Sequence, residues 1–450
     1  MSTKKTAKKV AKKTATKTTR RSKSKPRRAV IVAGVRTPFV KAFGPFLKMD
    51  SIALGVAAVD GLLRETELPR NEIESIVWGG VILPGFAPNV AREIALDLRL
   101  PASVEGCTVT RACASGLQAI TNAAAAIERG DADVVIAGGS DSTSNAEIKL
   151  PQKVVHALAP LAFGKASPSD MLGVLAQMMP LSEILPQKPE IAERSTGEVM
   201  GEAAEKMAAR NEISREAQDE FAVRSHHRAA AAIASGRFDR EIVPVQAPDG
   251  TWIHQDMLVR GDTSVEKLAR LRAVFAKNGT LTAGNSSPLT DGASAVLLMS
   301  EEKALALGYE PLAVIRDWSY VAVDPADQLL MGPALSMPKV ADKVGLKLED
   351  FGLVDIHEAF AAQVLSVLKM MGSDAFCQSR CGRDAAFGEI DPERLNVHGG
   401  SVSLGHPFGA TGARMVTTMA NELKLRDEQF ALLGICAAGG LGASAILEHI

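Results

Sequence analysis

Two cysteines and two histidines lie at points where apolar strand patterns give way to turns or helices. The first is Cys113, which follows the alternating run 104–109 and precedes an Ala-rich helical pattern over 115–129. A helix N-terminus presents free amide groups and the positive end of its dipole, and both stabilise a thiolate. We therefore expect Cys113 to be a nucleophile with a lowered pKa; the alternative is an inert buried cysteine.

Three further residues are candidate partners for this thiol. His357 ends an apolar strand pattern, His406 lies in the Gly-rich turn 405–412, and Cys436 ends the last apolar run before Ala-Ala-Gly-Gly. A cysteine nucleophile needs a base to take its proton, and glycines let the backbone approach a ligand closely. Each residue alone has an ordinary structural explanation. Four such residues at four strand ends together indicate one active site.

These residues must be positioned by strands and helices that alternate along 29–144 and again along 309–450. The predicted strands are 29–33, 76–78, 104–109, 133–137, 296–299, 313–315, 353–356 and 430–436, and the main predicted helices are 51–64, 89–98, 115–129 and 412–425. Continuously apolar strands are typical of sheets buried on both faces. The runs 134–139 and 430–440 both end in Ala-Gly-Gly, which is a weak internal repeat. The sequence predicts an α/β protein with two similar halves and functional residues at strand ends.

The stretch 145–271 has a different character. Six prolines punctuate its first part, and a charged helical stretch follows over 198–237. We predict an inserted, mostly helical domain that divides the first half into 29–144 and 272–308. Within it, the Met- and Leu-bearing segment 171–179 is either the wall of an acyl tunnel, a membrane-facing surface or ordinary core.

Composition is typical of a globular enzyme, with 46% hydrophobic and 23% charged residues in 450. The N-terminal residues 1–28 differ, because they contain 13 Lys or Arg and no acid, although the formal net charge of the chain is only −1. Such a segment cannot bury enough apolar surface to fold. We expect a disordered basic tail that is either a solubilising extension or a binder of polyanions or a membrane surface.

Five cysteines, an odd number in a long chain, favour a reducing compartment over a disulfide framework. Cys377 and Cys381 have Cys-x3-Cys spacing, but no further ligands follow at zinc-site spacing, so we expect no metal. Residues 430–447 carry no charge. Their glycines favour a buried strand–turn–strand over a membrane span.

Five passages together resemble the thiolase family, and they occur in the order of that family: 111–119, 284–293, 357–360, 405–412 and 436–440. The resemblance covers essentially all of residues 29–450. It implies the layered αβαβα thiolase fold, in which the insertion 145–271 is the CoA-binding loop domain. The His-Glu-Ala-Phe form of the third passage, in place of the commoner Asn-Glu-Ala-Phe, resembles trifunctional-protein β-subunits and their bacterial counterparts. Those members of the family degrade 3-ketoacyl-CoA.

The resemblance also implies a reaction. Cys113 would attack the keto carbon of a 3-ketoacyl-CoA while His406 takes its proton, and the backbone amides of Cys113 and Ala438 would hold the oxyanion. His357 and His406 would stabilise the departing acetyl-CoA enolate, which Cys436 would protonate. The two cysteines would need environments that separate their pKa values. No cofactor is implied, because coenzyme A is a substrate.

Binding residues and partners follow from the same resemblance. The positions that match CoA contacts are Arg260, Phe275, Ala283 and Ser287. The expected assembly is a homo-oligomer, either a dimer or a dimer of dimers, and a hydratase/dehydrogenase partner subunit stays open. The expected location is cytoplasmic, of bacterial type, rather than the mitochondrial matrix.

Three alternatives stay open at this point. The chain could be an acetyl-CoA C-acetyltransferase that works in the condensing direction, or a catalytically idle thiolase-like scaffold subunit. A condensing enzyme of the ketoacyl-synthase type is the third, but it needs no second cysteine, so Cys436 argues against it.

Overall fold

The structure, a computed structural model, describes residues 27–148, 150–162, 164, 185 and 192–450. The Met- and Leu-bearing segment 171–179 and the first 26 residues of the predicted tail lie outside these residues. Arg27 and Arg28 lie inside them and form ion pairs with Asp133 and Glu301. The predicted end of the tail is therefore wrong by two residues, because these arginines belong to the folded part.

The helices and strands fall into three groups along the chain. The first comprises β1 (Ala29–Arg36), β2 (Val40–Lys41), α1 (Ser51–Thr66), β3 (Ser75–Gly79), α2 (Val90–Asp97), β4 (Glu105–Val109), α3 (Ser115–Arg129) and β5 (Val134–Ser142). The second comprises α4 (Gln152–Ala162), α6 (Met200–Arg210), α7 (Arg215–Ala234), β6 (Val245–Gln246), β7 (Trp252–Ile253), α8 (Val265–Ala269), β8 (Thr290–Ser300) and α9 (Glu301–Ala306). The third comprises β9 (Ala313–Ala322), α10 (Pro325–Gln328), α11 (Pro333–Val344), β10 (Leu353–Ile356), α12 (Ala361–Met371), α13 (Asp374–Phe376), α14 (Ser401–Leu404), α15 (Phe408–Arg426), β11 (Phe430–Ala437) and β12 (Leu441–Glu448).

The main sheet contains two similar halves in the strand order β10-β11-β12-β9-β1-β8-β5-β3-β4. In the first half, β5 runs parallel to β3 and antiparallel to β8, and β8 pairs antiparallel with β1. In the second half, β11 runs parallel to β10 and antiparallel to β12, and β12 pairs antiparallel with β9. Within the sheet, two residue pairs between β1 and β9 join the halves. The predicted pair of similar α/β halves is confirmed.

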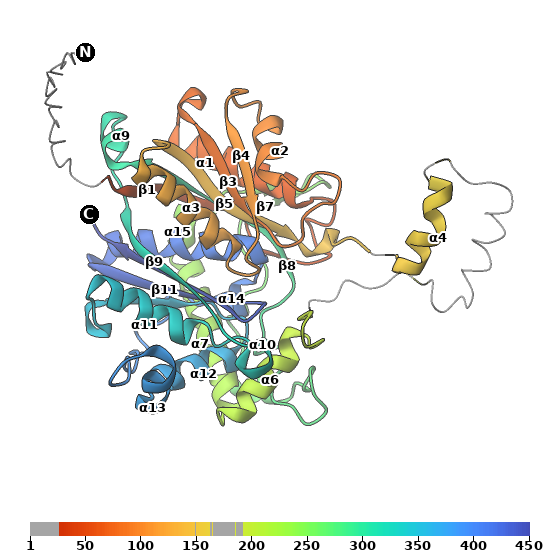
Figure 1. Cartoon of the computed structure of the whole chain (residues 1–450), viewed down its shortest axis with the longest axis vertical. Coiled ribbons are helices and arrows are strands. Elements are labelled where there is room, and N and C mark those ends of the chain that lie inside the picture. The colour runs from red at the N-terminus through yellow and green to blue at the C-terminus, as the bar shows by residue number, and fades with distance from the viewer. Residues whose placement is uncertain (1–26, 149, 163, 165–184, 186–191) are drawn as a thin grey trace, which may run out of the picture.

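The helices form three layers around the two halves of the sheet, as Figure 1 shows. One apolar core packs α1 and α2 against the first half, and another packs α6, α11 and α12 against the second. The third core contains α3 and α15, which lie side by side between the halves. This is the αβαβα arrangement of the thiolase fold. It places the N-terminal ends of α3 and α15 next to each other at the centre of the molecule.

Local signals placed several elements correctly. Helix α3 begins at Ser115 and ends at Arg129, where Gly130 adopts a left-handed conformation with φ 82°. Strand β10 has the predicted bounds. The charged stretch 198–237, by contrast, forms two helices, α6 and α7. Strand β4 is a partly exposed edge of the sheet rather than the buried strand predicted for 104–109.

The predicted repeat of Ala-Gly-Gly has two different structural causes. Gly138 and Gly139 lie inside β5, which continues to Ser142. Both must be small because neighbouring backbone atoms pack closely against them. Gly439 and Gly440 instead form the turn between β11 and β12, with φ values of 84° and 68°. Such angles favour glycine. The Ala-Gly-Gly motif repeats in the sequence, but Gly138 and Gly139 permit close packing of backbones, whereas Gly439 and Gly440 permit a turn.

Helix α15 begins at Phe408, inside the Gly-rich turn, and not after Gly412 as the sequence suggested. A Cβ at Gly409 would lie 2.6 Å from the carbonyl oxygen of Gly79, and one at Gly412 would lie 2.5 Å from the amide nitrogen of Leu117. Tight tertiary packing therefore overrides the low helix propensity of these glycines. Among the described residues, no helix combines the length and apolar composition that a membrane crossing requires.

We expect Gly139→Ala to destabilise the fold. Its added Cβ would overlap the carbonyl oxygen of Gly409 and lie 2.8 Å from that of Gly79, and backbone atoms cannot turn away as a side chain can. Overpacking of this kind costs about 1–3 kcal/mol or more. The thermal unfolding midpoint should fall clearly, as circular dichroism can measure. Gly372→Ala is the control, since its Cβ meets nothing nearer than 3.5 Å; equal midpoints for the two variants would contradict the packing explanation.

Candidate active site

Cys113 lies in the turn between β4 and α3, directly before the helix cap at Ala114. The Ser115 hydroxyl accepts a hydrogen bond from the amide of Arg111 at 2.8 Å and donates one to the carbonyl of Ala112 at 2.6 Å. Ala112 itself has a left-handed φ of 46°. These features make a tight turn that directs Cys113 towards the second half of the molecule.

His357 follows β10, and its amide donates to the carbonyl of Gly434 on β11 at 2.8 Å. His406 precedes α15, and its amide donates to the hydroxyl of Thr290 at 3.0 Å. Backbone hydrogen bonds to neighbouring strands thus hold both histidines. Their ring centroids lie 4.2 Å apart.

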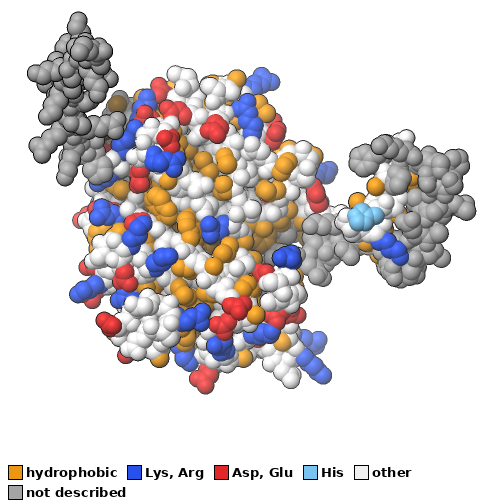
Figure 2. Space-filling view, viewed as in Figure 1, with side chains coloured by type: hydrophobic (Ala, Val, Ile, Leu, Met, Phe, Trp, Pro, Cys, Tyr) orange, Lys and Arg blue, Asp and Glu red, His pale blue; other side chains and the backbone are white. Residues whose placement is uncertain are grey.

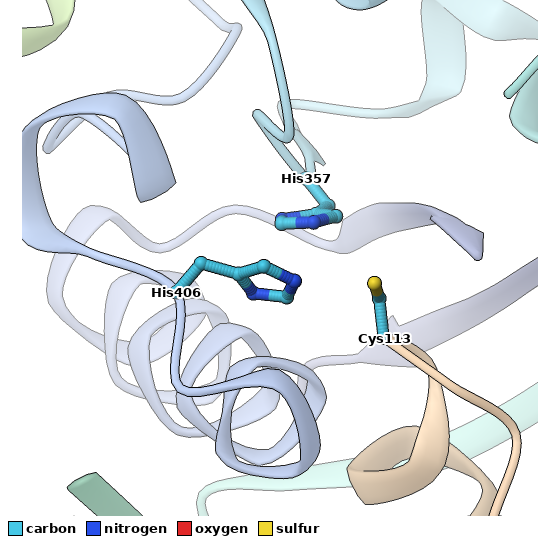
Figure 3. Close-up of side chains that lie close together, drawn as sticks. All are labelled: Cys113, His357 and His406. Atoms are coloured by element: carbon cyan, nitrogen blue, oxygen red, sulfur yellow. The ribbon is translucent and has the colours of Figure 1, made fainter. Parts of the chain in front are cut away.

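Each imidazole is also held by one hydroxyl through its Nδ1 atom. His357 Nδ1 lies 2.9 Å from Ser401 Oγ, and His406 Nδ1 lies 2.7 Å from Thr411 Oγ1. Both Nε2 atoms are buried and have no hydrogen-bond partner among the residues that the structure describes. Figure 3 shows these rings facing the thiol of Cys113, and ligand atoms of the three side chains lie within 4.8 Å of one another.

Cys436 and Ala438 complete the group at the end of β11. The backbone amides of Ala438 and of Cys113 itself both donate to the Cys113 sulfur. These two hydrogen bonds favour the thiolate and partly oppose the effect of burial on the pKa of the thiol. Cys436 is fully buried, and its pKa is raised well above the usual value by burial and by the nearby Cys113. The structure therefore brings all five predicted catalytic residues to one place.

The expected low pKa of Cys113 is contradicted. Burial raises the pKa of this thiol to about 12, although the two amides oppose the shift. Burial and the charge of Arg414 lower the pKa of His406 to about 3. The pKa of His357 is also well below its ordinary value, chiefly because of burial. At neutral pH the ligand-free site therefore holds an uncharged thiol beside uncharged imidazoles, because desolvation outweighs the helix N-terminus.

The buried carboxyl group of Glu358, the residue after His357, joins several segments around that histidine. Glu358 accepts hydrogen bonds from Asn396 at 2.7 Å, from the Ser225 hydroxyl at 2.7 Å and from the amide of Val402 at 3.1 Å. Burial raises its pKa despite these donors. Gly400 must lack a side chain, because a Cβ there would overlap the Glu358 carboxyl group. The network ties the insertion, through Ser225, to helix α14, which begins at Ser401.

Asp141 supports the turn that carries His406. This buried side chain at the end of β5 accepts the amides of Ile82 at 2.6 Å, Gly409 at 2.7 Å and Val81 at 3.0 Å. Burial raises its pKa to about 7, against the effect of these amides. Because Gly409 is in the first turn of α15, the carboxyl group fixes the start of that helix.

Sequence reasoning did not find Ser401, Thr411, Asn396 or Asp141 as functional residues. One signal was available for Thr411, which lies five residues after His406. Glu358, which binds Asn396, follows His357 directly. The other contacts join residues far apart in the chain, such as Asp141 and Gly409. No local pattern reveals such pairs.

The four predicted CoA contacts lie around the insertion. The Phe275 ring packs edge-on against Phe360, with centroids 5.7 Å apart, and the amide of Ser287 donates to the carbonyl of Ala359 at 3.0 Å. These two residues border the His-Glu-Ala-Phe segment. Ala283 and Arg260 are exposed, and no contact in the described part of the chain joins Arg260 to the catalytic residues.

Comparison with known proteins agrees with this geometry. Residues 29–302 match the family model described as "Thiolase, N-terminal domain", and residues 309–449 match "Thiolase, C-terminal domain". The chain is 43% identical over 427 residues to the 3-ketoacyl-CoA thiolase of Shewanella woodyi, which covers 94% of this chain and 98% of that protein. The corresponding protein of Pseudoalteromonas translucida is 43% identical over 423 residues, with coverage of 94% and 97%.

Two solved structures are also similar. The Bacillus anthracis acetyl-CoA acetyltransferase superposes with a TM-score of 0.79 at 34% identity, over 94% of this chain and 99% of that one. Human mitochondrial 3-ketoacyl-CoA thiolase in complex with CoA has a TM-score of 0.78 at 29% identity, over 94% and 98%.

The hydroxyl at Thr411 should be needed for the reactivity of Cys113. In Thr411→Val the shape is kept but His406 loses its Nδ1 partner, so the imidazole is no longer held towards the thiol. Loss of one hydrogen bond of this kind costs about 0.5–1.5 kcal/mol, or about 2–10-fold in rate. We expect a drop of that order in the rate of Cys113 alkylation by iodoacetamide at pH 7, followed by peptide mass spectrometry.

Thr417→Val is a matched control on the same helix. The hydroxyl of Thr417 is buried but has no hydrogen-bond partner in the described part of the chain, so its removal should leave the alkylation rate unchanged. Equal rates for Thr411→Val and the unmodified chain would show that Thr411 does not position His406.

Proposed function

The chain belongs to the thiolase family, and from this premise we propose that it is an acetyl-CoA C-acyltransferase acting on 3-ketoacyl-CoA. It uses a second CoA to cleave that substrate into acetyl-CoA and an acyl-CoA shortened by two carbons, as in fatty-acid β-oxidation. The observation that carries the proposal is the convergence of Cys113 with His357 and His406, beside a second buried cysteine, Cys436. Relatives at 43% identity over most of the chain support the same activity.

The first step forms the acyl-enzyme. The Cys113 proton passes to His406 Nε2, which has no other partner among the described residues, while the sulfur bonds to the C3 keto carbon and the carbonyl electrons move to oxygen. The amides of Cys113 and Ala438, which already point at the sulfur, stabilise that oxyanion. Because the thiol pKa is raised, the nucleophile forms as His406 takes the proton, and not beforehand.

The second step breaks the C2–C3 bond. The carbonyl re-forms as a thioester on Cys113, and the acetyl-CoA enolate leaves with its oxygen near His357 and His406. The enolate carbon takes a proton from Cys436, whose raised pKa keeps it protonated until then. A second CoA thiol then gives its proton to the Cys436 thiolate and attacks the thioester. Cys113 leaves and recovers its proton from His406, so the cycle closes.

The insertion supplies the CoA site in this proposal. Phe275 and Ser287 border the His-Glu-Ala-Phe segment, where the reacting end of a CoA ester must lie. Arg260 and Ala283 lie on the exposed surface of the same region. An exposed arginine suits the anionic nucleotide end of CoA.

An exposed sheet edge supports a homo-oligomer. Strand β4 ends the main sheet, and no other described strand pairs with its outer edge. Nearby lie the apolar side chains of Phe86, which is 78% exposed, and Leu96 on α2, which is 51% exposed. Hydrophobic side chains also gather across the middle of the face in Figure 2. We propose that β4 and its neighbours form the contact of a dimer.

The proposed location is cytoplasmic, which the five unpaired cysteine thiols support. The catalytically idle scaffold stays an alternative, but the complete catalytic group counts against it. The acetyl-CoA C-acetyltransferase alternative is favoured by one observation, the similarity to the Bacillus anthracis structure. The two enzymatic functions differ in the chain length of the substrates that they accept.

Thiolysis across a series of 3-ketoacyl-CoA substrates of four to sixteen carbons tests the proposed function. We expect turnover of chains longer than four carbons, with the acyl group on Cys113 in mass spectra, and no adduct in Cys113→Ala. Cys436→Ser should still take an acyl group from acyl-CoA onto Cys113. Its thiolysis rate should fall about 10²–10⁴-fold, as for loss of a general acid.

Other outcomes have clear meanings. Turnover of acetoacetyl-CoA alone would favour the acetyltransferase, and no turnover of any substrate would favour the scaffold. An adduct on Cys107 or Cys436 in place of Cys113 would overturn the catalytic assignment.

The basic tail supports a second interaction. Its residues 1–26 carry 11 Lys or Arg and no acid, and such a segment attracts polyanions through counterion release. Because Arg27 and Arg28 pair with the body, we propose that only the first 26 residues serve this purpose.

Deleting residues 1–26 should therefore leave kcat and the sedimentation coefficient of the dimer unchanged at physiological salt. The same deletion should abolish salt-sensitive retention on DNA and on anionic lipid vesicles. A truncated chain that loses turnover or sediments as a monomer would show that the tail belongs to the catalytic body.

A further inference from the structure

Three potential metal ligands meet at the bottom of the active site. The ligand atoms of Cys113, His357 and His406 lie within 4.8 Å of one another, and no other His, Cys, Asp or Glu group in the described part of the chain converges in this way. A tetrahedral Zn²⁺ with two imidazoles at about 2.0–2.1 Å and a thiolate at about 2.3 Å places these atoms about 3.3–3.6 Å apart. The three side chains must therefore draw closer together to bind the ion.

The two histidines are prepared for a metal in a second, independent way. Both Nε2 atoms are buried and lack a hydrogen-bond partner among the described residues, and the two rings lie beside the thiol (Figure 3). Both Nδ1 atoms are held by hydroxyls, those of Ser401 and Thr411. When Nδ1 carries the hydrogen, Nε2 presents its lone pair to the site. Metal-binding histidines are oriented by the same kind of hydrogen bond from the second nitrogen.

We propose that Cys113, His357 and His406 form a binding site for Zn²⁺ that reversibly inhibits the enzyme. The inhibition rests on the proposed function, because the three ligands are also the nucleophile, its base and the group that stabilises the enolate. Binding replaces the thiol proton with the S–Zn bond and releases that proton to solvent, with no change in oxidation state. The fourth ligand position is left to a water molecule.

Zinc and substrate compete for the sulfur of Cys113, because the thiol must give up its proton to bind a metal. Acylation of Cys113 removes the thiolate, so substrate that has acylated the enzyme protects it.

Cys377 and Cys381 are the other pair of neighbouring cysteines that can compete for zinc, and their replacement provides a control. Cys377 is buried and Cys381 is half-buried in a π-helical turn, and their sulfurs contact the carbonyls of Met371 at 3.6 Å and Ala334 at 3.5 Å. They offer two ligands and no histidine. Their replacement leaves the catalytic group intact.

Cobalt(II) serves as a spectroscopic probe for zinc in the full-length chain. We expect one Co²⁺ per chain with a thiolate-to-cobalt charge-transfer band and the intense visible bands of a tetrahedral ion, both removed by Zn²⁺. The double variant Cys377→Ser/Cys381→Ser should keep the spectrum, and Cys113→Ala should lose the charge-transfer band and at least about 100-fold in affinity. X-ray absorption of the zinc form should show one sulfur and two imidazole nitrogens.

The outcomes separate this proposal from the proposed function, because binding is measured without substrate. A charge-transfer band that survives in Cys113→Ala but disappears in the double variant would overturn the zinc site, as would the absence of any band. Tight zinc binding in a chain without thiolysis activity would leave the site standing and refute only the proposed function. Zinc that binds at the predicted ligands but leaves thiolysis unaffected would refute the inhibitory role.

Discussion

The catalytic geometry depends on a contact between backbones at the centre of the molecule. The N-terminal turns of α3 and α15 meet there against β3 and β5, and four of the positions in contact are glycines: Gly79, Gly116, Gly139 and Gly409. A Cβ at Gly116 or Gly139 would overlap the carbonyl oxygen of Gly409. Because side chains are absent, the two helices approach closely enough for Cys113 and His406 to share one site. Packed interiors do not deform gradually, so this contact sets the distance between nucleophile and base.

The acidic and basic side chains of the site do not touch the reacting atoms but contact the segments that hold them. Asp141 and Glu358 hold the segments next to the two histidines. A buried ion pair of 3.1 Å joins Arg414 on α15 to Asp355 on β10. The groups that face the thiol are neutral imidazoles, a neutral thiol and backbone amides. A site of this kind stabilises charge as it develops in the reaction, and holds none beforehand.

The insertion is joined to the body by further buried ion pairs. Arg36 on β1 binds Asp256 through two hydrogen bonds of 2.7 and 2.8 Å, and Arg237 pairs with both Glu241 and Glu422. Buried ion pairs add little net stability, but loss of one partner leaves an uncompensated charge. The segment that supplies the proposed CoA contacts is therefore held in one orientation relative to α15, which begins two residues after His406.

The sequence by itself determined the local units of this protein. Helix α3 and the turn of Cys113 follow from an alternating apolar run, an Ala-rich helical face and a terminal glycine within 27 residues, and the motifs around His357, His406 and Cys436 indicated a common chemistry. Tertiary structure alone decided that α15 begins within its glycine-rich turn, that the two Gly-Gly pairs serve different purposes, and that Ser401 and Thr411 hold the histidines. It also reversed the expected pKa of Cys113. A helix N-terminus is visible in a local pattern, whereas desolvation depends on residues hundreds of positions away that close over the thiol.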